Sequence, residues 1–120
     1  MRTANALRAA LLTLTLAVTA AASAVPAHYT VTMTERYAGA GSERGTLDLR
    51  IPADGIISGS YHTFDGVGPY PVSGGRRGDL VWLDYRNVRV IATLGPKSID
   101  GRAFREGSTE EYGFHAVLTP

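Results

Sequence analysis

The chain has 120 residues and a formal net charge of +1, with 14 glycines and no cysteine. This length predicts one domain at most. A nearly neutral chain has no overall electrostatic attraction to nucleic acid or to anionic membranes, so neither is an expected partner. Without cysteine the chain can form no disulfide and can carry no thiol-linked lipid anchor.

The first residues have the composition of a secretory signal peptide. Arg2 and Arg8 form a positive start, and the apolar run from Ala9 to Ala21 follows it. This run is shorter than the roughly 20 residues that a transmembrane helix needs. A short apolar segment behind positive residues is typical of a cleaved export signal.

Small residues offer two cleavage points, after Ala27, which we prefer, and after Ala24. We therefore expect a helical signal peptide at residues 1–27 and a single domain at residues 28–120, secreted or periplasmic. Loss of the two signal arginines changes the formal charge to −1. We expect no membrane association after cleavage.

The domain opens with a strand from His28 to Tyr37. Tyr29, Val31 and Met33 lie on one face, and threonines alternate with them on the other. A period of two between apolar and polar residues is typical of a half-buried strand. The glycine-rich segment from Gly39 to Gly45 should then form a loop.

The clearest local pattern is a hairpin between residues 46 and 63. Thr46 to Ile51 alternates in period two, and Ile56 to Tyr61 has strand composition. Asp54-Gly55 stands between them, and Asp-Gly favours a tight turn because glycine tolerates positive φ. This hairpin is the repeating unit of the domain.

Turn residues divide the rest of the chain. Phe64 to Pro71 forms the longest connection, because its prolines lack the amide donors of a central strand. The Arg77-Gly78-Asp79 tripeptide is read as a polar turn rather than as an adhesion motif. The remaining strands are predicted at Val72 to Arg76, Leu80 to Tyr85, Val88 to Leu94, Ile99 to Arg105 and Tyr112 to Leu118.

Short strands about ten to twelve residues apart, without helical periodicity, favour an all-β fold. Closure removes the exposed edges of a meander, so we predict a small eight-stranded antiparallel up-and-down barrel, with a β-sandwich as the alternative. Glycines inside the strands would permit the coiling that small barrels need. They are Gly59, Gly74, Gly75, Gly101 and Gly113.

A weak internal repeat supports this organisation. Ile57-Ser58-Gly59 and Ile99-Asp100-Gly101 lie 42 residues apart, and Val72 and Phe114 share the same offset. Such self-similarity is consistent with a duplicated strand unit.

The segment from Asp54 to Tyr61 (DGIISGSY) resembles the early hairpin of avidin-like and streptavidin-like barrels. The resemblance covers about eight residues and the strand count, and it implies an eight-stranded secreted barrel without a catalytic role. That family binds biotin with several tryptophans, whereas this chain has Trp82 alone. The resemblance therefore implies the architecture and no biotin site.

Residues suited to catalysis are scattered. Ser58, Ser60 and Ser73 stand in no nucleophile-elbow motif, and the carboxylates fall mostly in predicted turns or on outward faces. His62 and His115 lack the spacing of metal ligands, although a cluster of both with Asp65 would suggest chemistry. We expect no enzyme, no metal and no cofactor.

The strand from Leu80 to Tyr85 is apolar on both faces. Whichever face is inside, an apolar row remains outside, with Ile91 as its extension. Exposed apolar patches mark interfaces, so we expect a homodimer or a protein partner at the fifth and sixth strands. The residues expected to bind a partner or ligand are Tyr61, Val81, Trp82, Leu83 and Tyr85.

The sequence thus predicts a non-enzymatic binding module for a protein or a small ligand. One alternative is an inhibitor of an exported enzyme that uses an edge, the connection Phe64 to Pro71 or the turn at Arg77. A less favoured alternative is a hydrolase with its site at the barrel mouth. A filled barrel would favour a protein partner, and a hollow barrel a small ligand.

Overall fold

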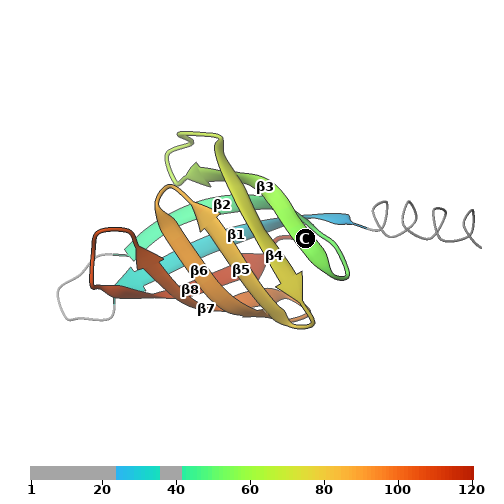
Figure 1. Cartoon of the computed structure of the whole chain (residues 1–120). Helices are drawn as coiled ribbons and strands as arrows, with labels where there is room; N and C mark the ends of the chain where they lie inside the picture. Colours follow the sequence, from blue (N-terminus) through green and yellow to red (C-terminus); the bar gives the residue numbers. More distant parts are fainter. Residues whose placement is uncertain (1–23, 36–41) are drawn as a thin grey trace, which may run out of the picture.

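The computed structural model describes residues 24–35 and 42–120 of the chain. Residues 1–23 of the predicted signal helix and the end of the first predicted strand lie outside these residues. Val25 to Ala27, which were predicted to end the signal helix, belong to a strand. The eight strands are β1 (Val25–Glu35), β2 (Ser42–Ile51), β3 (Gly55–Thr63), β4 (Tyr70–Arg77), β5 (Leu80–Tyr85), β6 (Val88–Leu94), β7 (Ser98–Arg105) and β8 (Glu111–Leu118) (Figure 1).

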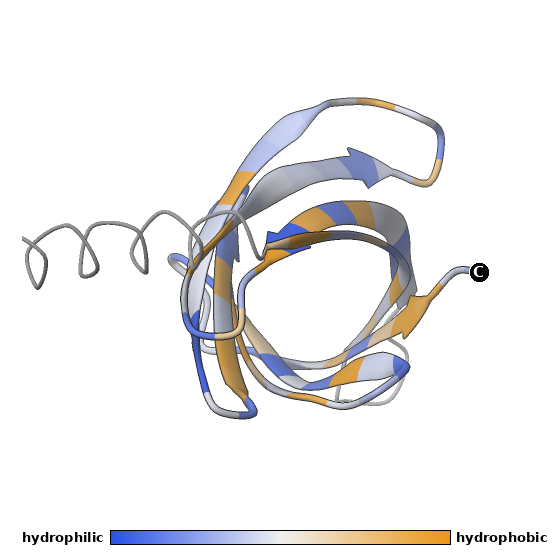
Figure 2. Cartoon of the chain, turned by 90° about the vertical axis from the view of Figure 1, so that its right-hand side faces the viewer, coloured by the Kyte–Doolittle hydropathy of each residue, from blue (hydrophilic) through white to orange (hydrophobic). Residues whose placement is uncertain are grey.

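The strands form a closed antiparallel barrel in which each strand pairs with its neighbours in sequence. β1 closes the ring, because it pairs with β2 along one side and with β8 along the other. Figure 2 shows this ring of strands end-on. The predicted eight-stranded up-and-down barrel is confirmed, and the β-sandwich is wrong.

Alternating side chains fill the interior of the barrel. Tyr29, Val31 and Met33 of β1 are buried, as their spacing predicts. They join one cluster of contacting buried residues, to which every strand contributes. Its largest fully buried members are Tyr61, Leu47, Leu49, Ile57, Leu83 and Ile99.

Three strands begin two or more residues earlier than their sequence pattern indicates. β1 begins at Val25 and β4 at Tyr70, and β2 begins at Ser42, so part of the predicted loop from Gly39 to Gly45 is strand. Ser42 to Gly45 continue the ladder with β1. Pro71 is tolerated in β4 because it pairs with β3 alone. The ladder between β4 and β5 begins at Ser73, so no β5 residue needs the amide hydrogen that proline lacks.

Glycine allows neighbouring backbones to approach closely at the coiled points of the barrel. A Cβ at Gly59 would lie 2.0 Å from the carbonyl oxygen of Asp48, and one at Gly74 would lie 1.9 Å from that of Trp82. These separations are too short for any side chain, so both positions require glycine.

The internal repeat has a counterpart in the strand pairing. Gly59 of β3 lies opposite Val72 of β4, and Gly101 of β7 lies opposite Phe114 of β8. The isoleucine two residues before each glycine is fully buried in both hairpins. The β3–β4 and β7–β8 hairpins therefore have the same register at the same 42-residue offset.

Candidate functional site

The structure divides the predicted binding residues between the two faces of the barrel. Tyr61, Val81, Leu83 and Tyr85 are buried in the core, and Trp82 lies outside, 38% exposed. In β5, the strand that is apolar on both faces, the odd-numbered residues thus point into the barrel. Of the predicted set, Trp82 alone is available to a partner on the outer surface.

Trp82 belongs to an apolar surface that crosses four strands. Ile56 of β3, Gly75 of β4, Trp82 of β5 and Ile91 of β6 are consecutive partners in the ladders. Ile56 is 82% exposed and Ile91 48% exposed, and Leu80 lies beside them, two residues along β5 from Trp82. We call Ile56, Leu80, Trp82 and Ile91 the outer apolar row.

Gly75 explains how the row stays flat. A Cβ at this position would lie 2.3 Å from the Trp82 ring, so the indole lies across the strand where a side chain would otherwise stand. The indole thus covers Gly75, which stands between Ile56 and Trp82 in the ladders. Sequence analysis missed Ile56, although only one residue of the Ile56-Ile57 pair can face the core in a strand.

Ion pairs flank the outer apolar row. Arg89 Nε lies 2.8 Å from Asp84 Oδ1, and Arg102 Nη1 lies 2.9 Å from Glu111 Oε1. The Asp84 carboxylate raises the pKa of Arg89 through its hydrogen bond and its charge. The rim therefore combines both signs of charge around an apolar centre, which is typical of protein interfaces.

One mouth of the barrel holds a carboxylate among arginines and tyrosines. Glu43 of β2 lies 2.9 Å from Arg105 and 3.6 Å from Arg86, and the Tyr61 hydroxyl is 3.5 Å away. Burial raises the pKa of Tyr61, and the charge of Glu43 raises it further. The Arg86 guanidinium also lies over the Tyr70 ring, 4.6 Å from its centre.

The members of this cluster pair with one another. Sequence analysis missed it, although Glu43 stands at an inward position of the alternation that Leu47 and Leu49 continue. Arg105 and Arg86 both contact the Glu43 carboxylate, so its oxygens are engaged within the protein.

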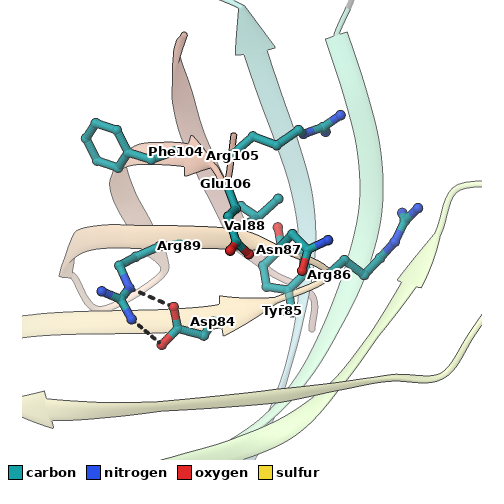
Figure 3. A pocket seen from close by; sticks show the side chains of 9 residues that line it. All are labelled: Asp84, Tyr85, Arg86, Asn87, Val88, Arg89, Phe104, Arg105 and Glu106. Carbon is teal, nitrogen blue, oxygen red and sulfur yellow. Dashed lines mark hydrogen bonds and ion pairs between the residues drawn. The ribbon is translucent and has the colours of Figure 1, made fainter. Parts of the chain in front are cut away.

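A pocket of about 590 Å³ lies beside this mouth, between the β5–β6 turn and the end of β7 (Figure 3). Arg86 and Asn87 form the turn, both with positive φ, as a two-residue hairpin loop requires. The charged groups of the wall are largely paired. Arg89 donates from Nε and Nη2 to the two carboxylate oxygens of Asp84 (Figure 3), and Arg105 donates to Glu43. The lining residues include no Ser, Cys or His.

The histidines are held apart on different strands. His115 of β8 contacts Asp100 of β7, and His28 of β1 contacts Asp48 of β2. His62 pairs with Thr46 in the β2–β3 ladder. Within residues 24–35 and 42–120, no three His, Cys, Asp or Glu side chains come together as metal ligands would.

The arrangement around Asp100 differs from a nucleophile with its base. Ser98 Oγ donates to Asp100 Oδ2 at 2.6 Å, and His115 contacts the other carboxylate oxygen. The Ser98 hydrogen bond, followed by that of His115, lowers the pKa of Asp100. In catalysis the histidine would stand between serine and carboxylate, whereas here the carboxylate stands in the middle.

Comparison of the chain with protein-family models, with curated proteins and with solved structures gives no match. In the part of the chain that the structure describes, there is no helix long and apolar enough to cross a membrane.

Proposed function

We propose that this protein is a secreted or periplasmic, non-enzymatic binding module that recognises a protein partner through the outer apolar row. The observation that carries the proposal is the exposure of Ile56, Trp82 and Ile91, which stand on β3, β5 and β6 in one line of ladder partners. A single exposed apolar residue needs no explanation, but a connected row with a central tryptophan is typical of an interface.

The filled interior supports a protein partner over a small ligand. Tyr61 and Tyr85 stack inside the barrel with ring centres 4.6 Å apart. The core cluster occupies the space that a ligand would need. The likeness to avidin-like barrels extends to a secreted scaffold of this kind and brings no biotin site.

The proposal is tested by a double variant, Trp82→Ser with Ile91→Ser, of the mature protein. Wild type should form a concentration-dependent homodimer or retain a specific protein from the exported fraction. The affinity of this association should fall at least tenfold in the double variant, because a central aromatic residue contributes strongly to an interface. Sedimentation equilibrium measures the homodimer, and quantitative mass spectrometry measures the retained proteins.

Val117→Ser is the matched control, since Val117 is an exposed apolar residue on β8, outside the row. The free energy of unfolding of every variant should stay within about 1 kcal/mol of the wild-type value. A wild-type protein that stays monomeric at high concentration, and a double variant that retains the same proteins as wild type, would contradict the proposal.

A further inference from the structure

The loop between β3 and β4 carries two apolar side chains into solvent. Phe64 is 81% exposed and Val67 is 50% exposed. The loop stands clear of the neighbouring turns at the top of Figure 1. Phe64 and Val67 stand three residues apart on the same loop, and an exposed aromatic side chain can supply much of the contact area of an interface.

Internal hydrogen bonds fix the shape of this loop. Thr63 N donates to Val67 O at 2.9 Å, and Gly66 N donates to Thr63 O at 2.9 Å. Val67 N donates to Thr63 Oγ1 at 3.0 Å, so the threonine is bonded through both its backbone and its side chain. The positive φ of Gly66, 85°, completes the turn.

A further bond joins the loop to the barrel. Phe64 N donates to Arg44 O of β2 at 3.1 Å, which fixes the backbone from which the phenyl ring projects. A loop ordered before binding loses little conformational entropy when a partner engages it. Phe64 is thus a rigidly mounted apolar group, unlike the side chain of a freely moving segment.

The charge beside Phe64 narrows the class of partner. Asp65 is exposed between the two apolar residues, and the hydrogen bond from Thr63 lowers the pKa of its carboxyl. Asp65 therefore remains negative at neutral pH. A negative charge beside the phenyl ring disfavours insertion into an anionic lipid surface and favours a partner that carries a cation nearby.

We propose that the Thr63–Pro69 loop is a second binding element, which inserts Phe64 into an apolar pocket of a folded partner protein with a Lys or Arg at its rim that pairs with Asp65. The loop acts independently of the outer apolar row. If the pocket belongs to the cleft of an exported enzyme, binding would block the cleft, as in the inhibitor alternative predicted from the sequence.

Photo-crosslinking in the full-length protein tests this proposal. A benzophenone amino acid is placed at position 64, and in a second variant at position 104, because Phe104 is an exposed phenylalanine on β7. The protein is irradiated with the exported fraction of the producing cells. Position 64 should give a discrete adduct whose crosslinked residues line an apolar pocket with a basic residue at its rim, and position 104 should not.

Affinity for the crosslinked protein supplies the second measurement. Phe64→Ala should weaken binding at least tenfold, and Phe64→Leu should retain part of the affinity. Asp65→Asn should weaken binding less and remove much of its dependence on salt. Trp82→Ser should leave this affinity unchanged, which separates a failure of the loop from a failure of the outer apolar row.

Three outcomes of the crosslinking and affinity measurements would overturn the proposal. They are equal or absent adducts at the two positions, an adduct on a polar surface, and Phe64→Ala binding as tightly as wild type. A last measurement tests membrane binding, by flotation of the protein with zwitterionic and anionic lipid vesicles. Phe64-dependent flotation would assign the loop to a membrane surface and would also overturn it.

Discussion

At the scale of single residues, side-chain direction separates scaffold from surface. Tyr85 and Trp82 lie three residues apart on β5, yet Tyr85 is buried and Trp82 is exposed. The Tyr85 hydroxyl donates to the sulfur of Met33, 3.7 Å away, which is a weak acceptor. The tyrosine therefore contributes mainly through the packing of its ring on Tyr61.

We expect Tyr85→Phe to change the free energy of unfolding at pH 7 by less than about 1 kcal/mol, because it removes a weak hydrogen bond and keeps the ring. Burial raises the pKa of Tyr85 well above its ordinary value of 10.0. The unfolded chain thus releases this proton first, so the stability is fully present below pH 10 and falls as the pH rises further. Urea unfolding at pH 7 and above pH 10 should show a shallower alkaline loss for the variant.

Met33→Leu is the matched control for this prediction. It leaves the hydroxyl in place without its acceptor, so it should cost more stability at pH 7 than Tyr85→Phe does. It should also keep the alkaline loss. Equal alkaline loss in wild type and Tyr85→Phe would contradict the role of Tyr85.

At the scale of the strands, glycine position decides how tightly neighbouring strands coil. The five strand glycines look alike in the sequence, but the structure separates them. A Cβ at Gly74 would lie 1.9 Å from the Trp82 carbonyl oxygen, whereas one at Gly113 would have its nearest neighbour, Thr34 O, at 3.7 Å. Only the first of these two positions excludes a side chain.

Gly74→Ala should therefore destabilise the barrel by about 1–3 kcal/mol or more, because the strands must separate to admit the methyl group. Gly113→Ala should stay within about 0.5 kcal/mol of wild type. Urea unfolding followed by circular dichroism compares the two variants directly. Similar losses in both would show that strand propensity, rather than the close approach, determines the cost.

At the scale of the whole molecule, closure of the barrel limits how a partner can bind. Each of the eight strands has two hydrogen-bonded neighbours, so no strand offers its whole edge to a partner strand. Of the described residues, only short stretches, such as Tyr70 to Val72 of β4, pair on one side alone. A partner can bind the outer faces of the barrel or its loops. The outer apolar row lies on an outer face, and the second proposed binding element is the Thr63–Pro69 loop.

Closure also bears on the proposed cleavage of the signal peptide. Val25, Pro26 and Ala27 belong to β1 and pair with β2. Cleavage after Ala27 would remove these pairs, and cleavage after Ala24 would keep them. We expect Val25 to be the mature N-terminus, as measured by mass spectrometry of the exported protein.

A chain that begins at His28 should unfold with a free energy about 1–2 kcal/mol lower than one that begins at Val25, since it loses backbone hydrogen bonds to β2. A mature N-terminus at His28 in the exported protein would contradict this expectation. Equal stability of the two chains would show that the first three residues add nothing to the barrel.

The sequence by itself determined the number, order and inward faces of the strands. Alternation at Tyr29, Val31 and Met33 and the Asp54-Gly55 turn are local features, because side-chain period and turn conformation depend on adjacent residues. The barrel followed from them through the need to remove sheet edges. A strand that is apolar on both faces, however, has no local preference, so the orientation of β5 could not be predicted.

Only the tertiary structure decided which residues meet across strands. Four of the five predicted binding residues are buried in the core. Ile56, Gly75, Trp82 and Ile91 lie in four separate strands and are aligned by the ladders. It also placed Glu43 between Arg86 and Arg105. These contacts depend on strand register and barrel closure, which fix neighbours far apart in the chain and leave no trace in the local pattern.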